Sequence, residues 1–119
     1  IRDRALIDIA GGRYTTADEY LTSLSENRTD DLGAKSQYYL GQSLYDQAKY
    51  NEAITALVRV RTVYSRYEEW LMRSYLLLGD CYVKLNDKRN AAEMYRAVLT
   101  KYSGTPIGDE AQQKLRKVQ

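Results

Sequence analysis

Several residue types that build catalytic and metal sites are rare or missing in this chain. It has no histidine, one cysteine and one proline among 119 residues. Without histidine, neither a Ser-His-Asp nor a Cys-His nucleophilic arrangement can form, and histidine metal sites are excluded as well. A single cysteine excludes an internal disulfide, which suits the cytosol and a disulfide-free periplasmic domain equally. We therefore expect neither an enzyme nor a cofactor.

The chain also lacks a long apolar segment and a strong net charge. No run approaches the roughly 20 apolar residues that a membrane-spanning helix needs, so direct membrane insertion is not expected. The formal net charge of +2 argues against a nucleic-acid partner. The basic residues Lys114, Arg116 and Lys117 are expected in a last helical turn, where the helix dipole favours positive charge. Another protein remains the expected partner.

Tyrosine and the lone cysteine stand out among the residues that are present. The chain has twelve tyrosines and one tryptophan but no phenylalanine. Tyrosine joins a large apolar ring to a polar tip, so it suits half-buried helix contacts and binding surfaces. Cys81 follows an apolar helical segment, and we expect a buried, unreactive thiol. The adjacent acids Glu68 and Glu69 fall at an expected helix start, where they favour the helix dipole rather than acid–base catalysis.

One segment of the sequence occurs twice. Residues 39–64 return 38 positions later as residues 77–102. The matched positions pair Leu40 with Leu78, Gly41 with Gly79, Ala53 with Ala91, Leu57 with Tyr95, Val60 with Val98 and Tyr64 with Tyr102. A fixed period in the range of about 20–50 residues indicates a repeat array.

About seven helices are expected. Apolar residues recur with a period of about 3.6 residues throughout, and no strand is predicted. Ile1–Ala10 indicates the end of a first helix, Thr15 or Thr16 offers an N-cap for the second, and residues 27–33 are predicted to be a loop. The remaining helices are expected at Ala34–Ala48, Tyr50–Ser65, Tyr67–Leu85, Lys88–Tyr102 and Pro106–Val118.

The repeated small residues predict close packing within each helix pair. Gly41 and Gly79 fall in the middle of helices, where glycine costs roughly 1 kcal/mol relative to alanine. We expect them to face Ala53 and Ala91 across the pair, so that the two helices approach closely. The larger residues at the Leu57 and Val60 positions are then expected to fill the gap to the next repeat.

Taken together, these positions resemble the tetratricopeptide repeat. The resemblance is partial over residues 1–28 and good over 34–67 and 72–105, and it leaves 106–118 as a polar capping helix. It implies a single all-α domain, a right-handed α-α superhelix in which antiparallel helices stack as a solenoid. The period is 38 instead of the usual 34, and serines replace the proline usual at the repeat end.

The longer period and the tail after Tyr102 are similar to bacterial cell-envelope members of that family. Examples are the periplasmic partner of the Tol-Pal system and the lipoprotein of the outer-membrane β-barrel assembly machinery. This similarity favours the bacterial periplasm, with the cytoplasm as the alternative. Because the chain starts at Ile1 within an expected helix, we interpret it as a fragment of a larger protein.

The family resemblance also implies a binding groove lined by the first helix of each repeat. Transferred to this chain, the groove positions are Lys35, Tyr38, Gln42, Tyr45, Asp46, Arg73, Leu76, Asp80, Val83 and Lys84. Such a surface suits a peptide or helix segment of another protein. The alternative for Tyr38 and Tyr45 is that they pack within the solenoid or are solvated. The alternative for the whole chain is a structural or self-assembling spacer in a cell-envelope complex, associating through its repeat ends.

Overall fold

The described part of the chain is entirely helical. The computed structural model describes residues 14–26 and 28–119. Its helices are α2 (Tyr14–Ser25), α3 (Asp31–Asp46), α4 (Tyr50–Val63), α5 (Glu68–Lys84), α6 (Lys88–Tyr102) and α7 (Pro106–Val118). No strand occurs in these residues, which confirms the predicted all-α class. The helix expected at 1–10 lies outside the described residues.

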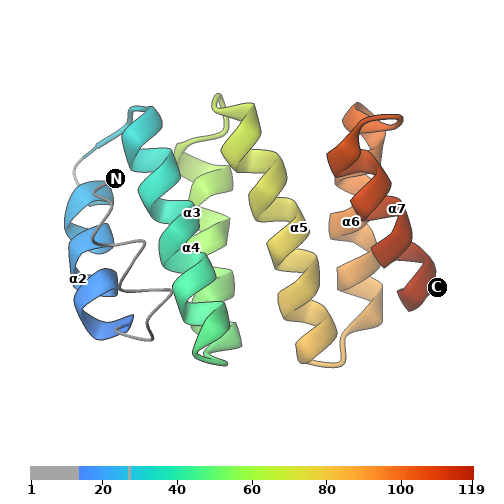
Figure 1. Ribbon diagram of the computed structural model, residues 1–119, viewed down its shortest axis with the longest axis horizontal. Helices are drawn as coiled ribbons and strands as arrows, with labels where there is room; N and C mark the ends of the chain where they lie inside the picture. Colours follow the sequence, from blue (N-terminus) through green and yellow to red (C-terminus); the bar gives the residue numbers. More distant parts are fainter. Residues whose placement is uncertain (1–13, 27) are drawn as a thin grey trace. The chain divides into compact units, whose positions relative to one another are not determined.

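The chain divides into two compact units, residues 1–74 and 75–119, with the boundary inside α5. In the first unit, α3 packs against α2 and α4, and Figure 1 shows α2 beside α3 and α4 behind it. In the second unit, α7 packs against α6. Neighbouring helices in sequence are therefore neighbours in space within each unit, as a helical repeat requires.

The observed helix ends correct two expectations. Helix α3 begins at Asp31, so residues 31–33 belong to the helix and not to the predicted loop. The reason is the N-cap: the Asp30 carboxylate accepts a hydrogen bond from the Gly33 backbone N–H at 3.0 Å. Arg28 also pairs with Asp30 at 2.7 Å, and these bonds lower the pKa of Asp30 to about 2. In α2, Thr15 and Thr16 both lie inside the helix and neither can be its N-cap.

The ends of α7 agree with the prediction. Thr105 is the N-cap and accepts a hydrogen bond from the Gly108 backbone N–H at 3.2 Å. Pro106 occupies the first turn, where its missing N–H is not needed. Ala111 and Leu115 are buried and attach this otherwise polar helix to the rest of its unit.

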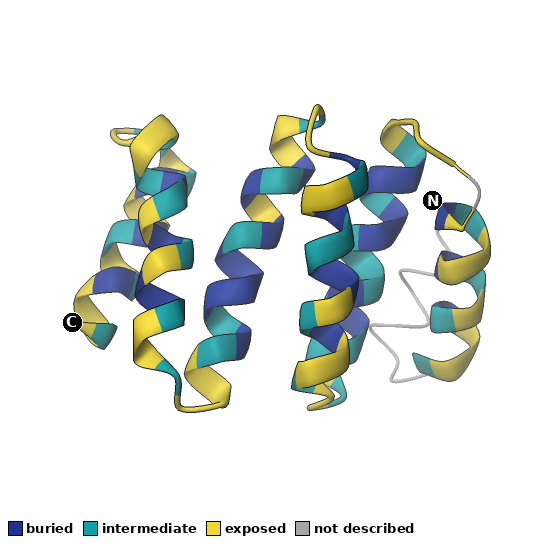
Figure 2. Cartoon of the chain, turned by 180° about the vertical axis from the view of Figure 1, so that it is seen from behind, coloured by how far each residue is buried: buried dark blue, intermediate teal, exposed yellow. Residues whose placement is uncertain are grey.

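Each unit buries one face of its helices. The buried residues of α4 lie on one face of the helix between positions 53 and 60, and Figure 2 shows buried and exposed residues alternating along the helices. The core cluster of the first unit consists of Ala34, Val60, Tyr64 and Trp70, with Tyr38, Tyr39, Val63 and Tyr67 packed against it. The buried residues of α6, in the second unit, are Ala91, Ala92, Tyr95 and Val98. Most of the repeated positions are thus core positions.

The nearest neighbours of the two repeat glycines are large side chains. A Cβ placed on Gly41 would collide with the Leu57 side chain, whose Cγ would be 2.6 Å away. A Cβ on Gly79 would collide with the Tyr95 ring, with Cζ at 2.7 Å. Each glycine therefore makes room for the large residue of its own helix pair, and the predicted contact with Ala53 or Ala91 stays a prediction. The prediction that the residues at the Leu57 and Val60 positions reach the next repeat agrees with Val60, which shares a core cluster with Trp70 of α5, and stays a prediction for Leu57 and Tyr95.

Candidate functional site

In the first unit, three of the predicted groove residues meet at one tryptophan. The Lys35 ammonium lies 5.9 Å from the centre of the Trp70 ring. The Arg73 guanidinium lies 5.3 Å from the same centre, and the Tyr38 ring centroid lies 5.8 Å from it. Lys35 and Tyr38 come from α3, and Arg73 and Trp70 come from the start of α5. We call these four side chains the Trp70 surface.

Trp70 itself is held firmly beneath this surface. Its side chain is 7% exposed, and its indole N–H donates a hydrogen bond to the Asp31 carboxylate at 3.1 Å. The Tyr39 ring lies 6.0 Å away and also contacts Tyr38 edge-on at 5.2 Å. Because both the ring and its polar edge have partners, Trp70 is a fixed side chain that positions the residues around it.

The other predicted groove residues of the first unit make local contacts near the end of α3. Gln42 donates a hydrogen bond to the Asp46 carboxylate at 2.9 Å. The Tyr45 ring packs edge-on against Tyr50, with centroids 5.5 Å apart, and Tyr45 is half-buried. These three residues lie on the same helix as Lys35 and Tyr38, but they form a separate polar and aromatic patch.

In the second unit, the predicted groove residues are in three different environments. Leu76 is buried at 7% exposure, whereas Val83 is 42% exposed and Lys84 is also exposed. Asp80 is occupied by other groups of its own unit: its carboxylate accepts a hydrogen bond from the Tyr95 hydroxyl at 2.7 Å. It also accepts bonds from the Lys114 ammonium at 2.7 and 2.9 Å.

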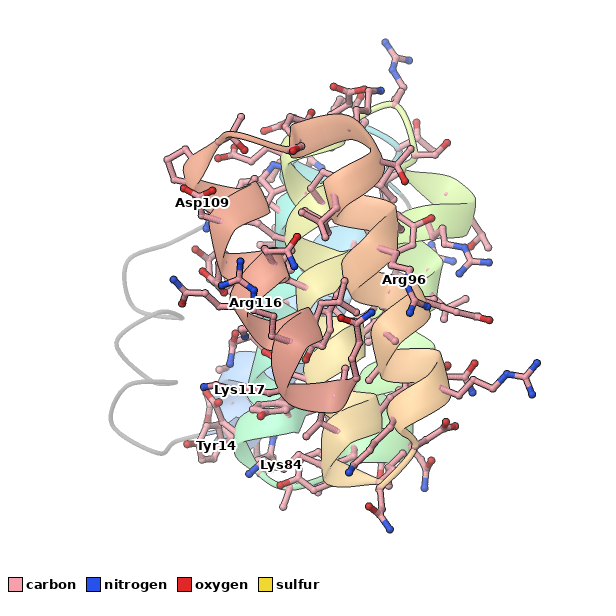
Figure 3. All side chains as sticks on the ribbon, turned by 90° about the vertical axis from the view of Figure 1, so that its right-hand side faces the viewer. Tyr14, Lys84, Arg96, Asp109, Arg116 and Lys117 are labelled. Carbon is pink, nitrogen blue, oxygen red and sulfur yellow. The ribbon has the colours of Figure 1, made fainter. Side chains whose placement is uncertain are left out.

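Sequence reasoning missed Trp70 and the role of Lys114. Trp70 is the only tryptophan of the chain, which could have drawn attention to it, but it falls outside the groove positions implied by the family. Lys114 was grouped with Arg116 and Lys117 in a last helical turn. Only Arg116 and Lys117 lie there (Figure 3), and Lys114 instead forms an ion pair with Asp80 on α5. No pattern in the sequence indicates that pair, because its members are 34 residues apart.

Cys81 is buried, as predicted, and it is not a reactive thiol. Burial, together with the nearby negative charge of Asp80, raises its pKa from the ordinary 9.0 to about 12. A thiol that remains protonated is a poor nucleophile and a poor metal ligand. Among residues 14–26 and 28–119, no group of three or more acidic or cysteine side chains could hold a metal ion. No helix in that part of the chain is long and apolar enough to cross a membrane.

Comparison with known families assigns the fold. A family model described as tetratricopeptide repeat matches residues 34–103, which is more than half of the chain. The protein therefore belongs to the tetratricopeptide repeat family. Such repeats generally mediate protein–protein interactions and are typically non-catalytic scaffolds. No curated protein matches the chain.

Proposed function

We propose that this protein binds an extended segment of a partner protein along α3 and the start of α5, on the Trp70 surface. The observation that supports this proposal is the convergence of Lys35, Tyr38 and Arg73 on Trp70. The family resemblance implied Lys35, Tyr38 and Arg73 as groove positions. These residues come from α3 and α5, which are the first helices of two consecutive repeats. Tryptophan, tyrosine and arginine are also the residue types that contribute most of the binding energy at protein interfaces.

The chemistry of the surface suits a peptide better than a small ligand. The buried Trp70 ring holds the side chains of Lys35, Tyr38 and Arg73 in place, and these supply an aromatic ring and two charged groups at the surface. Side chains of a peptide can alternate between the Tyr38 ring and these charges. Gln42 and Asp46, further along α3, add polar groups for backbone hydrogen bonds of a longer segment.

Tyr38 is not a suitable residue for testing this proposal by truncation. It is half-buried and packs against the core cluster that contains Trp70 and Tyr64. Tyr38→Ala is therefore expected to reduce stability as well as binding. Lys35 and Arg73 are better targets, because neither belongs to that core cluster.

A displayed peptide library, selected against the protein, tests the proposal. We expect selected peptides to change the fluorescence of Trp70 saturably, because Trp70 is the only tryptophan. Lys35→Ala and Arg73→Ala should each weaken binding. Arg89→Ala is the matched control, since Arg89 is an exposed cation on α6. If selected peptides bind both groove variants as tightly as the wild type, the Trp70 surface is not the binding site.

A structural or self-assembling spacer is the alternative function, and its prediction differs in solution. Sedimentation over a range of protein concentrations would reveal oligomers that grow with concentration if repeat ends stack on each other. A protein that binds its partner through the Trp70 surface is expected to keep the same mass throughout. The similarity to cell-envelope proteins remains a prediction from the sequence.

A further inference from the structure

The turn between α5 and α6 exposes two aliphatic side chains. Val83 is 42% exposed and Leu85 is 39% exposed, whereas the other large apolar side chains of residues 14–26 and 28–119 are buried or half-buried. All four residues 83–86 are exposed, and Figure 1 shows this turn at one end of the second unit. Scattered single apolar residues are normal on a surface, but these two lie together on a protruding turn.

Three exposed cations flank the two aliphatic side chains. Among residues 14–26 and 28–119, no ion pair involves Lys84, Lys88 or Arg89. Asp87 lies between them in sequence, but its carboxylate accepts hydrogen bonds from the backbone and the side chain of Asn90. Counting Asp87, the turn still has two more positive than negative charges. We call this surface the α5–α6 tip, and its residues are Val83, Lys84, Leu85, Lys88 and Arg89.

The first repeat shows that the fold does not require this combination of residues. At the positions equivalent to the three cations it has Asp46, Tyr50 and Asn51. The Tyr50 ring packs edge-on against Tyr45, which holds the position equivalent to Val83. Because a lysine replaces that ring in the second repeat, the valine remains exposed. The apolar and cationic character of the α5–α6 tip is therefore specific to the second repeat.

Helix capping does not explain the cations at the start of α6. Lys88 and Arg89 occupy its first turn, which contains no acidic residue. Positive charge is unfavourable there, because unpaired backbone N–H groups give this end of a helix a partial positive charge. Lys84 and Lys117, in the last turns of α5 and α7, lie toward the same end of the second unit in Figure 3. Positive charge from three helices thus gathers at this end.

We infer that the α5–α6 tip binds the surface of an anionic lipid membrane. Its cations bind the phosphate groups of the lipids, and Val83 and Leu85 enter the boundary between headgroups and acyl chains. A flat lipid surface suits a protruding turn, whereas a peptide segment suits a groove. Single-stranded nucleic acid binds best where aromatic rings stack on its bases, and the tip has no aromatic residue. The inference is independent of the proposed peptide binding, because it involves other residues.

Co-sedimentation with lipid vesicles tests the inference. One set of vesicles is pure phosphatidylcholine, and the other is an equimolar mixture of phosphatidylcholine and anionic phosphatidylglycerol. At low ionic strength we expect the protein to bind the anionic vesicles only. Added salt should release it, because salt screens charges at the membrane surface. Binding to neither kind of vesicle, or equally to both, would overturn the inference.

Two arginines of α6 provide a matched comparison. Arg89 and Arg96 are both exposed, and they lie about 10 Å apart along the helix axis. Arg89→Gln is expected to weaken binding to the anionic vesicles about fivefold, the usual contribution of one cation close to a membrane. Arg96→Gln should change it less than about twofold, because Arg96 is roughly one Debye length further from the lipid. Equal losses in the two variants would assign the binding to overall charge and contradict the inference.

The apolar residues of the tip are tested separately. The double variant Val83→Ser, Leu85→Ser should weaken binding about tenfold, because less apolar surface enters the membrane. Its helical circular dichroism should not change, since both side chains are exposed. Wild-type affinity in this variant would show that these side chains do not enter the lipid. If the protein binds an RNA oligonucleotide through Arg89 but does not bind the vesicles, the tip is a nucleic-acid site and the inference is wrong.

Discussion

Tyr64 connects α4 to the end of α2 through one buried hydroxyl group. The side chain is completely buried, and its hydroxyl lies 2.9 Å from the Ser25 carbonyl and 2.6 Å from the Arg28 carbonyl. One proton can serve one carbonyl at a time, so the bond is shared between them. A Cβ on Gly33 would approach the same ring at 3.0 Å. Tyr64 thus fixes the connection between α2 and α3 by a contact 39 residues away in sequence.

Removing this hydroxyl should be costly. Tyr64→Phe is expected to lower the free energy of unfolding by about 1–2 kcal/mol, because buried carbonyls lose their donor. Urea denaturation measures the change. Tyr67→Phe is the control: its hydroxyl donates to the exposed Thr29 carbonyl at 3.1 Å, so its loss should stay within about 0.5 kcal/mol. Equal losses in the two variants would contradict a special role for Tyr64.

Ala48 adopts a backbone conformation that alanine disfavours. Its φ is 63°, in the left-handed region, and Asn86 at the equivalent place of the next repeat has φ 60°. Left-handed backbone costs roughly 1–2 kcal/mol for alanine, whereas asparagine and glycine adopt it more readily. The left-handed backbone conformation of this turn therefore occurs in both repeats, although the residue that adopts it is alanine in one and asparagine in the other.

Ala48→Gly should stabilise the protein. The expected gain is about 0.5–1 kcal/mol, because relief of strain exceeds the extra entropy of glycine in the unfolded chain. Thermal and urea denaturation can both report it. Ala97→Gly, inside α6, should have the opposite sign and lose about 1 kcal/mol or more. A loss of stability in Ala48→Gly would show that the turn conformation is not as described.

At the scale of helices, the second helices of the two repeats begin differently. Asp87 precedes α6 and its carboxylate accepts the Asn90 backbone N–H at 3.1 Å. Lys49 holds the equivalent position before α4, and no side chain caps that helix start. The N-cap position of the second helix therefore has a side-chain cap in one repeat and lacks it in the other.

Transferring the cap should stabilise α4. Lys49→Asp is expected to raise the free energy of unfolding by about 1 kcal/mol, since a carboxylate accepts an otherwise unpaired N–H and favours the helix dipole. Asp87→Ala should lose about 0.5–2 kcal/mol by the converse argument. Lys49→Ala separates capping from simple loss of positive charge. If it stabilises as much as Lys49→Asp, the capping explanation fails.

At the scale of the whole molecule, Cys81 reports whether the fold is intact. Its thiol is buried, and its pKa of about 12 depends on that burial and on the charge of Asp80. In the unfolded chain the thiol ionises near 9. Because the folded pKa is the higher one, the associated stability is complete below pH 9 and is lost as the pH rises from 9 to 12.

Alkaline denaturation should reveal this difference. Between pH 9 and 10.5 the wild type is expected to lose stability more steeply than Cys81→Ala, by up to about 1.4 kcal/mol per pH unit. Ionisation of tyrosine and lysine occurs in both proteins, so it cancels in the comparison. Parallel stability curves would show that the thiol is not protected by the fold.

Much of the helical architecture could be predicted from sequence because its determinants are local. Both ends of α6 and α7 agree with the prediction, since the turn residues next to them are short-range signals. The start of α3 was missed because the capping function of Asp30 was not distinguished from a polar loop. The nearest neighbours of Gly41 and Gly79, Leu57 and Tyr95, were not foreseen, because spacing along a helix does not specify which residue of the partner helix comes closest.

The sequence alone determined that the protein is a helical repeat of the tetratricopeptide type, because periodic packing residues recur at matched positions. It also listed Lys35, Tyr38 and Arg73 as groove positions through the family resemblance. Only the tertiary structure decided that these three meet at Trp70, and that Asp80 is instead occupied by Lys114. The physical reason is that a period records what each repeat shares, whereas contacts between unlike residues of different helices depend on how those helices pack.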